Sequence, residues 1–272
     1  MKKIILGSLF FLLSGCALIT SRPSEEPQGI NRTALINPEG YFNQASDNQN
    51  INEAQTSGQT SKIDCQSQTI NEKTSTYTIS AQYPACNLAD DNKKQVLNEE
   101  VAKFIKNEVS SFKESLAEWP GPLAGILSTF DTNYKIETAN QRLISLDFTI
   151  DTYFNGAAHP NLYFLVFNYD LNKMSKIKLA DIFLANAKYL DKLSAMCKTN
   201  FTQKFSDLWF SEGCDPREES FSNFVILNSS LKFLIDPYQV APYAAGPQEL
   251  VINYTDLNGL LDTSGILTNI IK

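Results

Sequence analysis

The alternation of apolar and polar positions predicts several strands in the C-terminal two thirds of the chain. An apolar residue at every second position, as in residues 77–83 and 144–151, favours a half-buried strand. Pro84 is expected to end the first of these strands. The run 162–169 is apolar almost throughout, as in a central strand, and Asn155-Gly156 predicts a turn before it. Further strands are predicted at 224–227, 230–235 and 249–254.

Two longer helices are predicted between these strands. Asp90 and Asp91 open the first, because acidic side chains favour the positive end of a helix, and Pro120-Gly121-Pro122 ends it. Residues 188–205 form the second. The first helix has a largely apolar face made by Leu97, Val101, Phe104, Phe112 and Leu116. Without regular alternation of strand and helix, the pattern predicts an α+β fold: a mixed, mainly antiparallel sheet with two longer helices packed on it.

The N-terminal residues have the pattern of a lipoprotein signal peptide. Lys2 and Lys3 precede an apolar run, 4–13, that is shorter than the ~20 residues of a membrane-spanning helix. Leu13-Ser14-Gly15-Cys16 follows, with two small residues before a cysteine whose thiol can receive a lipid. Several acyl chains on Cys16, such as palmitate, would form a stable membrane anchor. The alternative is an ordinary secretory signal with a chance cysteine.

The predicted organisation has four parts. These are a signal peptide (1–15), a lipid-anchored flexible tether (16–62), a small α/β subdomain (63–125) and a C-terminal domain (126–272). The tether is predicted because its apolar residues are too sparse to bury a core. We expect a place in the bacterial envelope outside the cytoplasm: the outer membrane if the cell has two membranes, otherwise the outer face of the cell membrane.

The net charge and the cysteines indicate which partners and which compartment suit the protein. The net charge is −7, and losing Lys2 and Lys3 with the signal peptide makes it −9. An acidic surface disfavours nucleic acid and suits cationic partners.

The four remaining cysteines, Cys65, Cys86, Cys197 and Cys214, predict two disulfides in an oxidising compartment. Three pairings are possible. We favour the short loops, Cys65–Cys86 and Cys197–Cys214, each contributing about 3 kcal/mol in the chain-entropy model. A zinc site of four thiolates is the alternative, but no pair has the C-x2-C spacing that such sites usually use.

Three segments together resemble a family of extracytoplasmic domains of unknown function. Residues 153–161 resemble its Y-x-x-G-x-A-H-P-N turn, 177–183 its L-x-D-[IL]-F stretch, and 233–246 its F-x-x-Y-x-[IV]-A-P-Y-x-x-G run. This domain lies at the C-terminus of RsiV-type lysozyme-sensing anti-sigma factors and PdaC-type peptidoglycan deacetylases. Residues 65–119 are similar to the smaller domain that precedes it there. Asn172-Lys173-Met174 departs from the Thr-Gly that the family usually has in one turn.

The resemblance implies a binding role, because RsiV-type proteins bind lysozyme outside the cell with this region. His159 is the single histidine, in a turn between two strands. A catalytic base needs a nucleophile and an orienting carboxylate nearby, and a metal site needs several ligands. The sequence shows neither pattern, so we predict no catalytic residue, metal or cofactor.

Ligand contact is predicted for Tyr153, His159, Asn161, Tyr238 and Tyr243. Loops on a rigid sheet concentrate binding residues, and tyrosine offers a large contact area. The competing interpretation is structural: His159 and Asn161 fix their turn, and 236–246 is a stiff packed connection.

These observations favour a lipid-anchored, non-catalytic envelope binding protein. Its membrane contact is the lipid on Cys16, and its ligand is lysozyme, a similar cationic cell-wall hydrolase, or peptidoglycan. An envelope hydrolase or esterase acting through His159 and a structural envelope lipoprotein are the alternatives.

Overall fold

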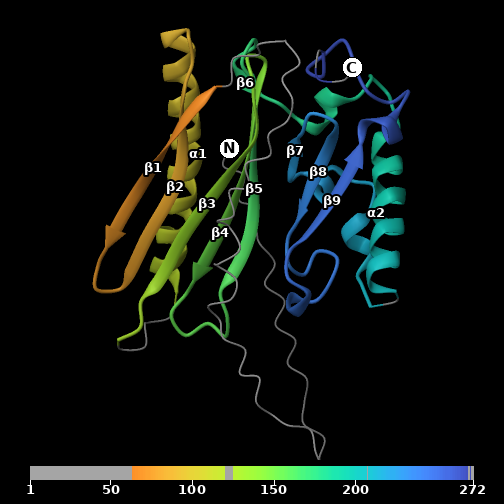
Figure 1. Ribbon diagram of the computed structural model, residues 1–272. Helices are drawn as coiled ribbons and strands as arrows, with labels where there is room; N and C mark the ends of the chain where they lie inside the picture. Colours follow the sequence, from red (N-terminus) through yellow and green to blue (C-terminus); the bar gives the residue numbers. More distant parts are fainter. Residues whose placement is uncertain (1–62, 120–124, 207, 269, 271–272) are drawn as a thin grey trace, which may run out of the picture. The chain divides into compact units, whose positions relative to one another are not determined.

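The computed structural model describes residues 63–119, 125–206, 208–268 and 270, so the predicted signal peptide, Cys16 and the tether lie outside the described residues. Its larger sheet has the strand order β1-β2-β3-β4-β5-β6 (Figure 1). β2 and β3 run parallel, and the other neighbours run antiparallel. The strands are β1 (Asp64–Lys73), β2 (Tyr77–Asn87), β3 (Ser128–Ala139), β4 (Leu143–Tyr153), β5 (Asn161–Asp170) and β6 (Ser175–Lys176).

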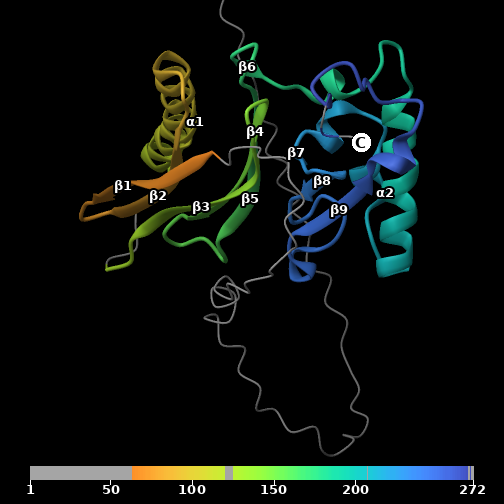
Figure 2. The ribbon, with the colours of Figure 1, turned by 45° about the horizontal axis from the view of Figure 1, so that its top comes forward.

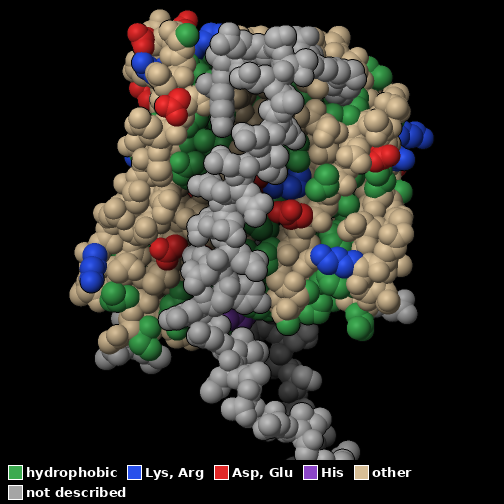
Figure 3. All heavy atoms as spheres, viewed as in Figure 1, with side chains coloured by type: hydrophobic (Ala, Val, Ile, Leu, Met, Phe, Trp, Pro, Cys, Tyr) green, Lys and Arg blue, Asp and Glu red, His purple; other side chains and the backbone are tan. Residues whose placement is uncertain are grey.

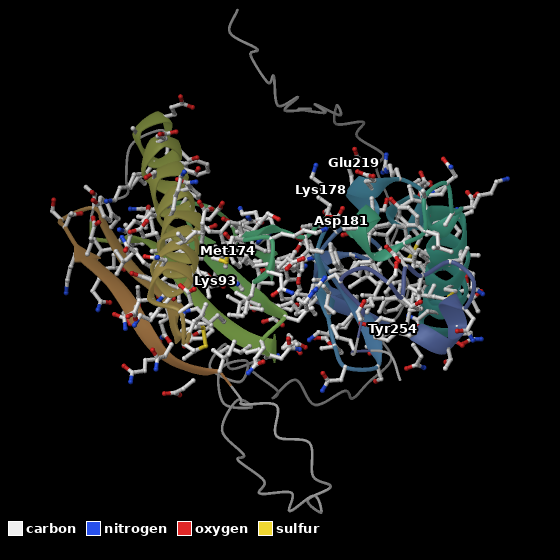
Figure 4. The ribbon with its side chains drawn as sticks, turned by 90° about the horizontal axis from the view of Figure 1, so that it is seen from above. Lys93, Met174, Lys178, Asp181, Glu219 and Tyr254 are labelled. Atoms are coloured by element: carbon white, nitrogen blue, oxygen red, sulfur yellow. A yellow bond between two sulfur atoms is a disulfide. The ribbon has the colours of Figure 1, made fainter. Side chains whose placement is uncertain are left out.

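Helix α1 (Asp91–Glu118) covers one face of this sheet (Figure 1). Its N-cap is Asp90, whose side chain accepts a hydrogen bond from the Lys93 amide at 3.0 Å. The buried stripe of the helix packs on alternate residues of β4, including Phe148. The start of the helix lies beside the turn between β5 and β6, where the Lys93 ammonium donates to the Leu171 carbonyl at 2.8 Å (Figure 4).

A second, three-stranded antiparallel sheet has its own helix and core. Its strands are β7 (Phe224–Ile226), β8 (Ser230–Ile235) and β9 (Gln248–Asn253), in that order. Helix α2 (Tyr189–Phe205) lies along it (Figures 1 and 2). Leu193, Cys197 and Phe201 of α2 recur every four residues and pack into this core.

The two sheets meet through hydrogen bonds that satisfy the backbone of β7. The Thr138 hydroxyl donates to the Ile226 carbonyl at 2.6 Å, and the Ile226 amide donates to Ser145 Oγ at 2.9 Å. Asn168 Nδ2 donates to the Phe224 carbonyl at 2.7 Å. Side chains of three strands of the larger sheet therefore take the place of a neighbouring strand for β7, because buried backbone groups need partners.

The α+β prediction is confirmed, with three differences in detail. Strands β7, β8 and β9, from residue 224 onward, form a separate sheet, and two strands of the larger sheet, β1 and β3, carry too few regularly spaced apolar residues for the pattern to reveal them. Pro84 does not end its strand, because β2 continues to Asn87. Among the described residues the β2–β3 ladder stops at Ala81, so Pro84 has one neighbouring strand, a place where proline is tolerated.

Both favoured disulfides are present. Cys65 and Cys86 lie directly opposite each other on β1 and β2. Cys197 of α2 is joined to Cys214 at the end of the 3-10 helix η3 (Ser211–Cys214). The second bond therefore ties the loop after α2 back onto the helix.

The larger sheet includes strands from both sides of the predicted subdomain boundary at 125/126. That boundary stays a prediction. In the described part of the chain, no helix combines the length and apolar character needed to cross a membrane.

The α1–sheet core predicts a strong effect of Phe148→Ala. The Phe148 side chain is fully buried between β4 and α1, where it contacts Phe104. Its removal should lower the free energy of unfolding by about 3–5 kcal/mol, measured by urea denaturation. Thr149→Ala, on the opposite face of the same strand, should cost less than about 1 kcal/mol. Equal losses for the two variants would contradict this packing.

Candidate functional site

Three of the predicted contact residues form one aromatic surface: His159, Tyr238 and Tyr243. The His159 ring stacks on the Tyr243 ring with 4.2 Å between centroids, and the Tyr238 and Tyr243 rings are 5.6 Å apart. The Tyr243 hydroxyl donates to the Pro160 carbonyl at 3.0 Å. The structure therefore joins the two segments, 153–161 and 233–246, that the sequence marked separately.

The turn that carries His159 is held by its neighbours. Asn155 is buried, its amide donates to Ser128 Oγ at 2.9 Å, and its side chain donates to the Ile126 carbonyl at 2.6 Å. The Trp119 indole donates to the Asn155 carbonyl at 2.9 Å. Gly156 has φ 90°, a left-handed conformation that glycine adopts without steric cost. The turn is thus fixed on the sheet.

The loop that carries the two tyrosines is fixed as well. Gln239 Nε2 donates to the carbonyls of Gly213 and Ser220 at 3.1 and 3.0 Å. A Cβ on Gly213 would lie 1.9 Å from the Gln239 carbonyl oxygen, so only glycine permits this approach. Tyr238 is 57% exposed and has φ 69°, which is rare for a bulky side chain. The backbone therefore presents an aromatic ring to solvent at a conformational cost.

The other two predicted contact residues lie on the adjoining strands. Tyr153 is the last residue of β4 and is half-buried, and Asn161 is the first residue of β5 and is exposed. The Asn161 carbonyl accepts a hydrogen bond from the Thr152 hydroxyl at 3.3 Å. Their roles in ligand contact stay predictions.

Two carboxylates face each other on the side of the sheet opposite α1. Asp131 of β3 and Asp151 of β4 are directly opposite in register and are half-buried. Burial raises the pKa of Asp131. Burial and the Asp131 charge raise the pKa of Asp151. This carboxylate pair shares a strand face with Tyr153, because side chains two apart on a strand lie on one face.

A third group of side chains lies where the two sheets meet. Lys232 of β8 has a side chain only 9% exposed, and its ammonium lies 2.6 Å from Glu137 Oε1, 3.5 Å from Asp147 Oδ2 and 3.8 Å from Glu249 Oε1. We call these four residues the Lys232 cluster. They come from β3, β4, β8 and β9, so the cluster spans both sheets.

The surroundings shift the pKa values of the two most buried acids of the cluster in opposite directions. Burial, together with a hydrogen bond to Glu137, raises the pKa of Asp147 to about 6. Burial opposes ionisation of Glu137 too, but hydrogen bonds from Lys232 and Asp147 lower its pKa. Glu137 is therefore the ionised acid that accepts hydrogen bonds from both neighbours, and Asp147 is the acid that keeps its proton most readily.

The sequence interpretation did not predict the Lys232 cluster. The available signal is Lys232 itself, a cation within the otherwise apolar run 231–235. Two of its partners, Asp147 and Glu137, lie 85 and 95 residues away in the chain, on strands of the other sheet. In the described part of the chain, no group of three or more histidine, cysteine or acidic side chains is arranged to hold a metal ion.

Comparison with known families matches two adjacent parts of the chain. Residues 70–162 match the family described as deacetylase PdaC, and residues 180–255 match a family of unknown function, DUF3298. The chain combines a PdaC-type domain with a DUF3298 domain. The resemblance inferred from the three motifs is thereby confirmed, and both halves of the aromatic surface fall within the matched segments.

Known relatives support this assignment. The peptidoglycan-N-acetylmuramic acid deacetylase PdaC of Bacillus subtilis (strain 168) is 26% identical over 215 residues, covering 78% of this chain and 44% of that protein. The chain thus spans less than half the length of this relative. The disulfides indicate an extracytoplasmic setting.

Two crystal structures share the fold. A DUF3298 family member from Bacteroides fragilis NCTC 9343 superposes with a TM-score of 0.55 at 18% identity, covering 74% of this chain and 94% of that one. A DUF3298 family protein from Pseudomonas aeruginosa PAO1 gives 0.50 at 14% identity, covering 77% and 95%.

The carboxylate pair predicts a pH-dependent stability difference. A raised pKa in the folded state contributes stability below the unfolded pKa of ~3.9, and that stability is lost as pH rises through the folded value. Asp151→Asn should therefore flatten the fall in unfolding free energy above about pH 4 and gain up to ~1 kcal/mol at pH 7, the range for cross-strand pairs. Chemical denaturation across this pH range measures it. A wild-type-like profile for Asp151→Asn would refute the pairing.

Proposed function

We propose that this chain is a non-catalytic envelope binding protein, anchored by a lipid on Cys16, that captures a cationic cell-wall hydrolase of the lysozyme class. The observation that carries the proposal is the aromatic surface of His159, Tyr238 and Tyr243. Its rings come from two segments that hydrogen bonds hold in place. His159 and Tyr238 are exposed, and Tyr243 is half-buried. Pre-positioned aromatic rings are typical contact residues of protein interfaces, because they bury a large area at low entropic cost.

Charge supports a cationic ligand. A net charge of −9 after loss of Lys2 and Lys3 attracts a basic protein over a Debye length of ~8–10 Å and speeds encounter. On the face shown in Figure 3, the described acidic and basic side chains are dispersed rather than gathered in one patch. The net charge supports the attraction, and the aromatic surface supplies the specific contact.

The relation to PdaC supports a role at the cell wall, since that enzyme acts on peptidoglycan by name. Peptidoglycan itself is accordingly the other ligand to test. Its neutral sugars would bind with little dependence on salt, whereas a basic hydrolase would bind less tightly as salt rises.

The aromatic surface predicts the residues that matter for capture. Tyr243→Ala removes the ring that both His159 and Tyr238 contact, and should weaken binding of a basic lysozyme at least ~10-fold, the equivalent of 1.4 kcal/mol. Tyr243→Phe keeps the ring and should lose less. Titration calorimetry at low and physiological salt measures both.

Leu184→Ala is the matched control, because Leu184 is an exposed apolar side chain, 47% accessible, outside the aromatic surface. Its affinity should equal that of the wild type. If the wild-type protein binds no lysozyme at low salt, the proposed ligand is wrong. Binding to purified sacculi that Tyr243→Ala abolishes would reassign the surface to peptidoglycan.

A further inference from the structure

The Lys232 cluster places an amine, a carboxylic acid and a proton acceptor together in a buried site. Lys232 and Asp147 are 9% and 6% exposed in their side chains, and Glu137 is 16% exposed. The Lys232 ammonium is 3.5 Å from Asp147 Oδ2 and 2.6 Å from Glu137 Oε1. Three acidic side chains surround one ammonium, and two of them, Glu137 and Asp147, are mostly buried with it, where unbalanced charge is costly.

We propose that Lys232 and Asp147 condense to form an isopeptide bond that links the two sheets covalently. Lys232 Nζ is the nucleophile, Asp147 Cγ is the electrophile, and Glu137 is the acid–base group between them. Strands of opposing sheets hold the Lys232 ammonium 3.5 Å from Asp147 Oδ2.

All protons are accounted for in this step. Glu137 accepts a proton from the Lys232 ammonium, and the free amine attacks Cγ of protonated Asp147. The C–N bond forms and the C–OH bond breaks, so the hydroxyl leaves as water. Of the four exchangeable protons, one stays on the amide nitrogen, two leave in the water and one remains on Glu137. No oxidant, reductant or cofactor is required.

Glu137 is the carboxylate closest to the Lys232 ammonium, at 2.6 Å, which suits it to accept the proton and leaves Asp147, at 3.5 Å, as the carboxyl group that is attacked. A neutral carboxylic acid can be attacked, whereas an ionised carboxylate repels a nucleophile and serves as a base. Hydrogen bonds from Lys232 and Asp147 converge on Glu137 and favour its ionised form. Burial opposes the charged form of Lys232, but its hydrogen bond to Glu137 and the surrounding acids raise its pKa. The amine therefore becomes a nucleophile only after its proton has passed to Glu137. Glu137 also lines a cavity, together with Ile136 and Ala139.

Tryptic peptide mapping of the purified full chain tests the proposal. Trypsin cuts after Arg142, Lys173 and Arg217, and an amidated Lys232 resists cleavage. The expected product is therefore a branched peptide of residues 143–173 and 218–272, lighter than the two together by one water. Separate linear peptides, with cleavage after Lys232, would overturn the proposal. A branch on residues 136–142 would assign the bond to Glu137 and overturn the choice of Asp147.

Three variants isolate the roles. Lys232→Arg keeps the cation and cannot form the bond, so its peptides should be linear. Glu137→Gln removes the proton acceptor and should leave most chains unlinked; full linkage would refute its role. Asp147→Asn should change the lost mass from water to ammonia. Circular dichroism confirms folding, and if a variant does not fold the wild-type peptide map still decides. Neither readout depends on ligand binding, so it stands apart from the proposed capture function.

Discussion

The structure depends on how the backbone of β7 is satisfied where the two sheets meet. β7 is an edge strand, and an edge that is buried must find partners for its amides and carbonyls. Thr138, Ser145 and Asn168 supply them from three strands of the larger sheet. The requirement explains why the face of β4 opposite α1 is polar in its covered part, where an apolar face would leave the β7 backbone unpaired.

The polar contact between the two sheets also limits how much of the fold can be predicted from the sequence. The apolar alternation of β4 identifies the face that packs on α1, and the helices follow from their periodicity and caps. β1 and β3 have no such signal, because β1 is a largely exposed edge and β3 directs polar residues toward that contact. Their pairing is decided by contacts distant in sequence, which local pattern does not encode.

The residues of the candidate site also differ in how far the sequence predicts them. His159, Tyr238 and Tyr243 could be selected from the sequence, because family motifs and loop position mark them. The contact between their rings could not be predicted, since the two segments are about eighty residues apart in the chain and follow strands of different sheets. Lys232 is the opposite case. Its position in an apolar strand is visible, but nothing local names Glu137 and Asp147 as its partners.

The contact between the two sheets and the aromatic surface depend on each other. His159 is carried by the larger sheet, whereas Tyr238 and Tyr243 follow β8 of the smaller one. Asp236 Oδ1 accepts from the Phe164 amide at 2.7 Å just after β8 ends, and Lys232 lies four residues earlier on that strand. Any sliding of β8 against β4 would separate the stacked rings. An ionic or covalent bond at Lys232 therefore holds the strand that precedes the two tyrosines. This is a physical reason for a charge in a mostly apolar strand, despite the cost of desolvating it.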